Sequence, residues 1–295
     1  MSEIDDDDEL TNAYSLFRAL EEKGKYIGRT NILHSVILVG KISPHITDHL
    51  AVGKYYDSLA HSFSSPDHIT GLLMIYPYHV IHIIESSFRT LLKVFRAIDK
   101  SDKIIEWYMK LHTERINLNI SEEEDRKPFS GFDRQTIQEM CRKYALAPTI
   151  HNRILCSLDN VVHRIFRTYE VLVLDMEATV ISDYDSNETD EKKLLDLLSQ
   201  VTRLSVHLAE EPMKGQEEYV PEIFRRKLTE ILSTIRQVHP ELIPQQAVVG
   251  YFADVSSYEG LISIKEYMNV YDLPYETSLQ SELTWPVQKN SFFYT

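Results

Sequence analysis

Over residues 31–176, short apolar runs alternate with segments whose apolar residues recur every three or four positions. The short runs are rich in β-branched and aliphatic side chains, which is typical of buried strands. The three-to-four spacing predicts amphipathic helices. The pattern therefore predicts the order β-α-β-β-α-β-β, with strands at 32–42, 69–76, 79–85, 153–158 and 165–174 and helices after Ser43 and at 88–98.

The first of these helices has a start signal in the sequence. Ser43 is a good helix cap, and Pro44 follows at the first helical position, where proline is favoured. We expect this helix to turn four apolar side chains toward the core: Ile46, Leu50, Leu59 and Phe63.

The third predicted strand is apolar on both faces. Val80, His82 and Ile84 point one way, and Ile81 and Ile83 point the other way. A strand of this kind has to be covered on both faces of its sheet. Two helices of a split β-α-β arrangement cover one face, so the second face needs the C-terminal segment or a partner protein.

The C-terminal third has helical spacing that suits this role. It predicts helices at 193–209, from Pro221 to about His239, and from Pro244 toward Tyr251. We expect these helices to pack on the second sheet face. The whole chain then divides into an acidic tail with a short helix at 1–30, an α+β domain at 31–176 with a polar, partly helical insertion at 100–150, and a helical extension with an extended tail at 177–295.

Composition and charge narrow the class of protein. Lys and Arg number 31 against 45 Asp and Glu, a net charge of −14, so we expect no binding to nucleic acid or to an anionic membrane surface. No apolar run reaches the roughly 20 residues of a membrane span, and the acidic start lacks the order of a secretory signal. Two cysteines, Cys141 and Cys156, are too few for a disulfide framework or a structural zinc site. We expect a cytoplasmic protein.

Motifs for catalysis and for phosphate binding are not found in the sequence. It lacks the glycine-rich nucleotide-binding motifs and the nucleophile elbow. His45 and His49 share a predicted helix face, but no third metal ligand accompanies them. We therefore expect neither an enzyme nor a metalloprotein.

Two polar residues on the third strand need an explanation. His82 lies between apolar neighbours, and a buried imidazole needs a hydrogen-bond partner. We interpret it as a core histidine with such a partner. Glu85 ends the strand, and we expect its carboxylate to cap the following helix.

The second and third strands carry a family resemblance. Residues 69–73, ITGLL, and 80–85, VIHIIE, resemble the hallmark of BLUF domains, the flavin-binding blue-light sensors with a ferredoxin-like fold. The series Arg164-x-Phe166-x-x-Tyr169-x-Val171 is similar to the last BLUF strand. The resemblance covers about residues 31–99 and 151–176 and implies the same β-α-β-β-α-β-β fold.

The flavin chemistry of BLUF domains does not carry over to this sequence. Leu38 stands at the position of the photoactive tyrosine and His82 at that of the glutamine. The flavin-binding asparagine falls near Ser64 or Ser65, and the last-strand tryptophan and methionine become Tyr169 and Val171. Leucine cannot donate an electron and a proton as tyrosine does. We expect a retained fold that has lost its flavin site and holds no cofactor.

A second resemblance extends over the whole chain. The stretch GLLMIYP…HIIESS and the C-terminal YDLPYETSLQSELTWP are similar to the testis-expressed protein 47 family, animal proteins with a degenerate BLUF-like domain. The resemblance to this family implies expression in cells that build motile flagella. The leading hypothesis is a non-enzymatic structural or scaffolding protein of motile cilia or sperm flagella, an axonemal accessory subunit with protein partners. The tails and the insertion would contact these partners, with Trp285 as a candidate anchor.

An alternative hypothesis keeps a ligand in the fold. A flavin- or small-molecule-binding sensor would use the cleft between the two predicted helices, with His82, Tyr169 and Arg164 as contacts. Bound flavin in the purified protein would favour this alternative.

Overall fold

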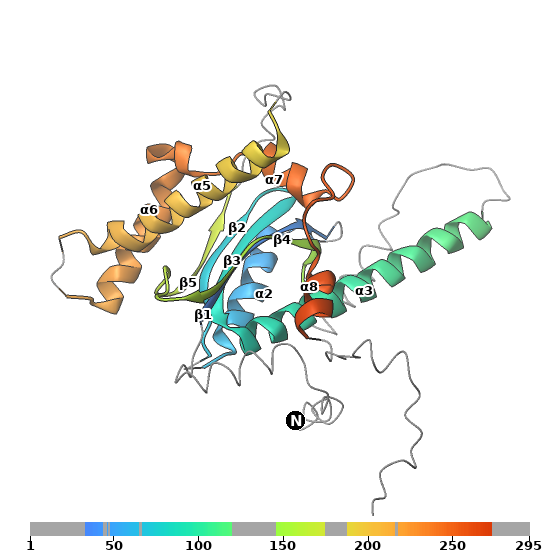
Figure 1. The fold of residues 1–295 in the computed structure, drawn as a ribbon, viewed down its shortest axis with the longest axis horizontal. Helices are drawn as coiled ribbons and strands as arrows, with labels where there is room; N and C mark the ends of the chain where they lie inside the picture. The colour runs from blue at the N-terminus through green and yellow to red at the C-terminus, as the bar shows by residue number, and fades with distance from the viewer. Residues whose placement is uncertain are drawn as a thin grey trace, which may run out of the picture. The chain divides into compact units, whose positions relative to one another are not determined.

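The computed structural model describes residues 33–43, 46, 48–64, 67–119, 146–174, 188–215 and 218–272, with the side chains of the helix that begins at Phe88 described as far as residue 106. Residues Asn31–Glu266 form one compact unit, which holds the strands and most of the helices (Figure 1). The predicted N-terminal helix, residues 120–145 of the predicted insertion, among them Cys141, and Trp285 lie outside the described residues.

The five predicted strands form one sheet. Its strands are β1 (Leu33–Ile42), β2 (Thr70–Ile75), β3 (His79–Ser87), β4 (Thr149–Val161) and β5 (Tyr169–Val173). They lie in the order β4-β1-β3-β2-β5, with β5 parallel to β2 and every other neighbour antiparallel. Two helices, α2 (His49–His61) and α3 (Phe88–Asn119), complete the split β-α-β arrangement. The predicted α+β fold is confirmed.

The structure explains why the ITGLL stretch has a glycine at position 71. Its backbone φ is +151°, a conformation that favours glycine. A Cβ atom at this position would lie 2.0 Å from the carbonyl oxygen of Ile83 on the neighbouring strand. Strands β2 and β3 can therefore approach as they do only because residue 71 has no side chain.

Both faces of the sheet are buried, as the pattern on β3 predicted. Leu38, Leu73 and His82 lie opposite one another across β1, β2 and β3 and face the helices α2 and α3. Their neighbours Val39, Leu72 and Ile81 face the other way and are fully buried there.

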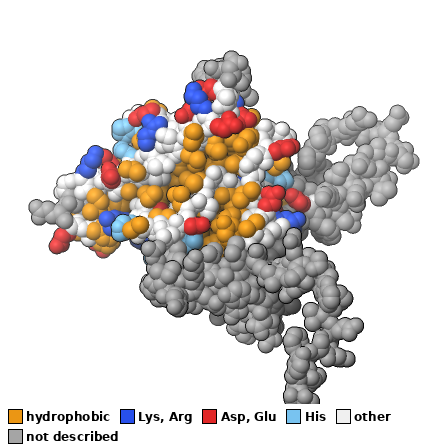
Figure 2. Space-filling view, viewed as in Figure 1, with side chains coloured by type: hydrophobic (Ala, Val, Ile, Leu, Met, Phe, Trp, Pro, Cys, Tyr) orange, Lys and Arg blue, Asp and Glu red, His pale blue; other side chains and the backbone are white. Residues whose placement is uncertain are grey.

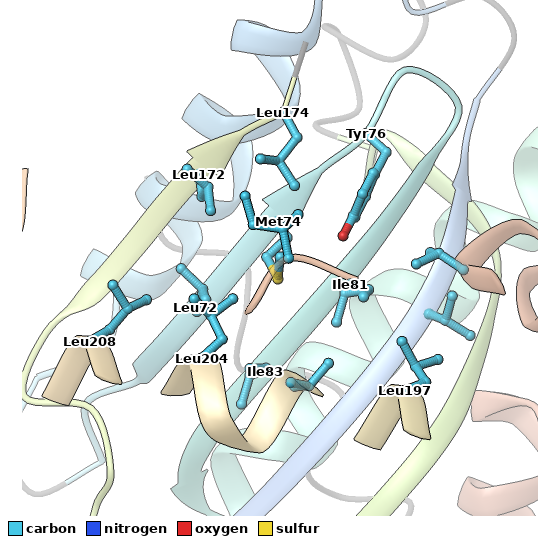
Figure 3. Packing of buried hydrophobic residues seen from close by; sticks show 14 of the residues in the cluster. Leu72, Met74, Tyr76, Ile81, Ile83, Leu172, Leu174, Leu197, Leu204 and Leu208 are labelled. Carbon is cyan, nitrogen blue, oxygen red and sulfur yellow. The ribbon is translucent and has the colours of Figure 1, made fainter. Parts of the chain in front are cut away.

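The C-terminal helices cover this second face, as expected. They are α5 (Asp190–Glu210), α6 (Pro221–Val238) and α7 (Gln246–Ala253), followed by α8 (Ile264–Tyr271), with short 3₁₀ turns at Glu211–Met213 and Pro240–Leu242. Leu197, Leu204 and Leu208 of α5 point onto the sheet (Figure 3). Burying side chains of this size is worth about 1.5–3 kcal/mol each.

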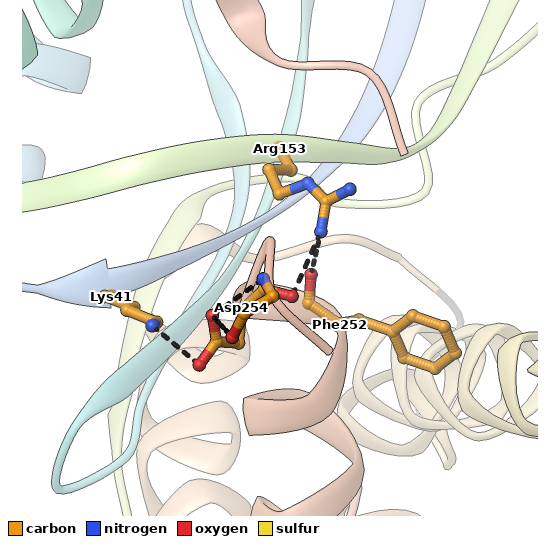
Figure 4. Close-up of polar contacts among 5 residues, drawn as sticks. Lys41, Arg153, Phe252 and Asp254 are labelled. Atoms are coloured by element: carbon orange, nitrogen blue, oxygen red, sulfur yellow. Dashed lines mark hydrogen bonds and ion pairs between the residues drawn. The ribbon is translucent and has the colours of Figure 1, made fainter. Parts of the chain in front are cut away.

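Polar contacts fix the segment that follows α7 to the sheet. The Arg153 guanidinium on β4 donates to the backbone oxygens of Phe252 at 3.1 Å and Leu261 at 2.9 Å. Lys41 on β1 forms an ion pair with Asp254 at 3.1 Å (Figure 4). Since these groups come from two strands and from the extension, the extension belongs to the same unit as the sheet.

Two expectations about the first helix are wrong. It begins at His49 rather than after Ser43, because the Asp48 carboxylate caps it by accepting the Leu50 N–H at 2.9 Å. Its buried residues are Val52, Gly53, Tyr56 and Ala60, whereas Leu50 is 60% exposed. The helix face that meets the sheet is therefore the one with Val52, Tyr56 and Ala60.

Several predicted boundaries also differ. Helix α3 continues to Asn119, whereas the predicted helix ended at residue 98. Strand β4 extends beyond 153–158 at both ends, and α7 begins two residues after Pro244. Strand β5 begins at Tyr169 instead of residue 165, because the N–H groups of Ile165 and Phe166 bond to a side chain and not to a neighbouring strand.

Candidate functional site

Four of the five positions that the resemblance to BLUF domains assigned to a flavin site lie on one face of the sheet. Leu38 and His82 are opposite each other on β1 and β3, and Leu73 of β2 links His82 to Val171 of β5 in register. Tyr169 is two residues before Val171, so it shares this face. Ser64 lies apart from them, as an exposed residue after α2.

A buried cluster of two tyrosines and a histidine occupies this face. The Tyr169 hydroxyl and the His82 Nε2 atom are 2.8 Å apart, and the Tyr56 ring from α2 lies edge-on against His82 with 4.7 Å between centroids. Tyr56 in turn forms a hydrogen bond with the Thr149 hydroxyl. All three ring residues are buried. The prediction that His82 is a core histidine with a hydrogen-bond partner is confirmed.

Burial sets the protonation of this cluster. Desolvation lowers the pKa of His82 to about 3 and raises the pKa of Tyr169 and of Tyr56 well above the ordinary tyrosine value. All three side chains are thus neutral near pH 7. A general acid or base works best with a pKa near the working pH, so the cluster is suited to packing rather than to proton transfer.

Tyr56 is the member of this cluster that the sequence reasoning missed. A signal was present, because Val52, Tyr56 and Ala60 recur every four residues and so share one helix face. The predicted helix start at Ser43 favoured another set of core residues. The ring that packs edge-on against His82 was therefore not identified.

Glu85 holds a loop and does not cap a helix, so the capping expectation is wrong. Its carboxylate accepts the backbone N–H groups of Ile165 and Phe166 at 3.1 Å and the Thr70 hydroxyl at 3.2 Å. Burial raises the pKa of Glu85, while these hydrogen bonds and the nearby Arg164 act to lower it. The carboxylate fixes residues 162–168 over the end of β3.

Arg164 secures the same loop. Its guanidinium donates to the Thr70 hydroxyl at 2.9 Å and to the backbone oxygens of Glu85 and His68 at 2.7 and 3.0 Å. A side chain with three protein acceptors is held firmly in place. Arg164 does not reach the Tyr56–His82–Tyr169 cluster through any of these bonds, so the three contacts expected of a sensor site are not brought together.

Asp102 on α3 is a second buried titratable group that the sequence reasoning did not single out. Burial and the nearby Glu106 raise its pKa to about 7, against the lowering effect of Asn152. Asp99, Asp102 and Glu106 have the three- and four-residue spacing that places acidic groups on one helix face. Burial of that face by the start of β4 could not be read from the spacing.

An open cleft lies on the other face of the sheet. It has a volume of about 600 Å³ and is lined by the loop after β4, the end of α5 and Tyr219. The Arg167 guanidinium lies over the Tyr219 ring, 4.6 Å from its centroid. In the described part of the chain, no group of three metal-ligating side chains could hold a metal ion, and no helix is long and apolar enough to cross a membrane.

Comparison with solved structures finds bacterial BLUF proteins. The BLUF domain of BlrP1 is 13% identical, with 68% of this chain and 90% of that chain covered and a TM-score of 0.28. Klebsiella pneumoniae BlrP1 in its calcium and cyclic di-GMP complex is 16% identical, with 69% and 34% covered and a TM-score of 0.28. A bacterial light-regulated adenylyl cyclase is 14% identical, with 62% and 41% covered and a TM-score of 0.27. The chain spans about a third of the length of the BlrP1 complex, and the fold assignment rests on the strand order rather than on these scores.

Comparison with family models gives a match over most of the chain. The model for testis-expressed protein 47 matches residues 32–143 and 133–273. These ranges take in all five strands and the helices α5, α6 and α7. The chain belongs to the testis-expressed protein 47 family.

Proposed function

We propose that this protein is a non-enzymatic structural or scaffolding subunit of motile cilia or sperm flagella, an accessory protein of the axoneme that binds other proteins and no flavin. Its partners are ciliary or axonemal proteins rather than nucleic acid or membrane. Family membership supports the flagellar setting, since the family is named for expression in the testis.

The packing around His82 is the observation that carries the non-enzymatic proposal. Tyr56, His82 and Tyr169 contact one another on the face where a BLUF domain would hold its flavin. A ligand in the cleft between α2 and α3 would have to displace at least one of these buried rings. The same contacts count against the alternative of a sensor that uses this cleft.

Fractionation of flagella tests the proposal. A tagged full-length chain is expressed at its native level in flagellated cells, and flagella are isolated and stripped of membrane with detergent. We expect the chain to stay with the axoneme and to be released only by high salt or denaturant. As a control, the tag alone should leave with the detergent-soluble fraction.

Proximity labelling provides a second test of association with the axoneme. A biotin ligase fused to the full chain should label axonemal proteins above the background of the free ligase. If the chain leaves with the soluble fraction and labels no axonemal protein, the proposed function is wrong.

A further inference from the structure

A carboxyl group lies where the middle of α3 meets the start of β4. Beside it, the Ser101 hydroxyl accepts the Ala147 backbone N–H at 2.8 Å, and Ile105 packs in one cluster with Ile150. Asp102 lies between these two contacts along the helix, and its Oδ1 atom is buried. The Asp102 carboxyl group therefore belongs to the contact between helix and strand.

Asn152 is the polar residue that faces Asp102 from β4. Burial raises the pKa of Asp102, and the backbone and side-chain N–H groups of Asn152 act to lower it. Their effect is incomplete, because neither Asp102 Oδ1 nor Asn152 Nδ2 has a hydrogen-bond partner among the described residues. A buried charge without full hydrogen bonding is more costly than a buried neutral group. The contact therefore favours the neutral form of the carboxyl.

The neighbours of Asn152 hold its amide in place. Its side-chain oxygen accepts the Thr149 hydroxyl at 3.0 Å. The same oxygen lies so close to Gly40 that a Cβ atom there would overlap with it. His151 has a backbone φ of +54°, a left-handed conformation that is uncommon for residues other than glycine. The start of β4 therefore has little freedom to offer Asp102 a better partner.

The charges on α3 also favour the neutral form. Asp99 and Glu106 lie three and four residues from Asp102, so the three acidic groups share one side of the helix. Lys103 forms an ion pair with Asp99. In the part of the chain that the structure describes, no basic side chain forms an ion pair with Asp102.

Titratable side chains of β4 and α2 face the same region. The His151 Nδ1 atom is 3.8 Å from the Glu106 carboxylate, so a positive charge on this imidazole would pair with Glu106. The pKa of Tyr56 is raised by burial and, to a lesser extent, by Asp102, which keeps this tyrosine neutral near pH 7. An ionised Asp102 would thus have acidic or neutral neighbours on α3 and α2.

These surroundings change the pH at which Asp102 titrates. Burial and the charge of Glu106 raise the pKa of its carboxyl from 3.8 to about 7. The docked helix therefore keeps a proton that the separated helix and strand would release between about pH 4 and 7. Docking is favoured at acidic pH and becomes weaker as the pH rises to about 7.

Helix α3 is long enough for this contact to affect its outer half. It has 32 residues, and its second half runs beyond the sheet (Figure 1). Leu91, Phe95 and Ile98 are buried and hold the first half on the sheet. Asp102 follows this anchor at the middle of the helix. A weaker contact at Asp102 therefore loosens the outer half while the first half stays in place.

We propose that Asp102 is a pH-sensitive switch, which holds the middle of α3 on the start of β4 while its carboxyl is neutral and loosens this contact when the carboxyl is ionised. The inference goes beyond the proposed scaffolding function and does not depend on it. It gives the chain a local conformational response to pH near neutrality.

Hydrogen exchange of the purified full chain at pH 6 and pH 8 tests the switch. The rates are corrected for the intrinsic pH dependence of amide exchange and are read from peptides that cover residues 99–106 and 146–152. With a pKa of about 7 when docked and 3.8 when exposed, the equilibrium constant for opening should increase about tenfold from pH 6 to pH 8. Asp102→Asn keeps the shape without the charge, so its opening constant should change less than about twofold.

Two further variants identify the titrating group. Glu106→Gln removes a charge that raises the pKa of Asp102, so it should move the loss of protection to lower pH in a series from pH 5 to pH 8. Histidine side chains also change charge in this range, so His151→Asn is the control. Asparagine tolerates a positive φ, and this variant should keep the tenfold change.

Three results would overturn the inference. The first is equal protection of the parent chain at pH 6 and pH 8, and the second is a tenfold change that persists in Asp102→Asn or disappears in His151→Asn. The third needs no variant: a change of the same size in peptides from β2 and β3 would show that pH acts on the whole fold and not on α3. The tests of association with the axoneme stand apart from all of these outcomes.

Discussion

The two faces of the sheet are covered in different ways. On the α2–α3 face, Tyr56 and Tyr169 surround His82, and all three are buried. On the other face, α5, α6 and α7 cover core residues of all five strands but leave Leu158 on the edge strand β4 51% exposed. The first face is closed by the chain itself, and the second is left partly open at its edge.

This difference supports the proposal that the chain binds proteins rather than a flavin. A cofactor site needs a space that the protein does not fill, and the face that corresponds to the BLUF flavin site holds neutral side chains that bond to one another. Hydrophobic side chains gather at the surface in the view of Figure 2, and exposed apolar surface is a feature of interaction surfaces. We therefore expect binding on the outer face of the sheet and no ligand on the buried α2–α3 face.

The largest effects should come from the helices that cover each face. Phe95 of α3 and Phe252 of α7 are fully buried, and Phe→Ala in a core costs about 3–5 kcal/mol. We expect Phe95→Ala and Phe252→Ala to lower the free energy of unfolding by similar amounts, measured by urea titration with circular dichroism. A loss below about 1 kcal/mol for Phe252→Ala would mean that the extension is dispensable to the sheet.

A smaller loss is expected from the His82 cluster. Tyr169→Phe removes the hydroxyl bonded to His82 Nε2 and leaves that atom without its partner, which costs about 1–3 kcal/mol of unfolding free energy. Tyr219→Phe removes a hydroxyl from a side chain that is 38% exposed and serves as the control, with a change below about 0.5 kcal/mol. Equal effects of the two substitutions would contradict a closed, hydrogen-bonded α2–α3 face.

The pH dependence of stability gives a third test of that face. The folded-state pKa of His82 is about 3, below the ordinary value of 6.5, so between these values the unfolded chain binds a proton that the folded chain does not. Its contribution is fully present above pH 6.5 and is lost as the pH falls, by about 1.4 kcal/mol per pH unit below 6.5.

Titration of Asp102 changes folding stability in the opposite direction over the same pH range. Its folded-state pKa is raised to about 7, so stability is lost as the pH rises from about 4 to 7. The comparison is therefore between the parent chain and His82→Leu, by urea titration from pH 5 to pH 8. The parent should lose more stability on acidification than the variant, and parallel curves would show that His82 is not buried in its neutral form.

The smallest effect on stability is expected at Leu158 on β4. Leu158→Lys changes an exposed side chain, so it should alter the unfolding free energy by less than about 0.5 kcal/mol, as should Val238→Lys. Thermal unfolding of both variants measures this. A loss above about 1.5 kcal/mol for Leu158→Lys alone would show that this side chain packs against the chain itself.

Much of the fold could be predicted because β3 is apolar on both faces. Its alternation indicated two covering layers, and the helical spacing of 193–209 identified one of them. The element order β-α-β-β-α-β-β followed from the same pattern, whereas the order of the strands within the sheet is known only from the structure. Helix starts were harder to predict, because Ser43 and Asp48 are both suitable caps and only tertiary packing selects Asp48.

The site could be predicted only in part. Burial of His82 between apolar neighbours followed from the pattern, and its need for a partner followed from chemistry. The identity of that partner depends on how β5 pairs with β2 and on the phase of α2, neither of which one sequence shows. Glu85 was misread for a similar reason, since the backbone N–H groups that donate to its carboxylate lie 80 residues further along the chain.

The central claim is that the chain's own side chains fill the former flavin position, and the visible absorbance of the purified full chain tests it most directly. The spectrum is recorded after incubation with excess flavin mononucleotide and desalting, before and after blue light. We expect no flavin absorbance above that of a control protein that binds no flavin. A stoichiometric flavin band that shifts to longer wavelength in blue light, and that is lost in His82→Ala, would contradict it.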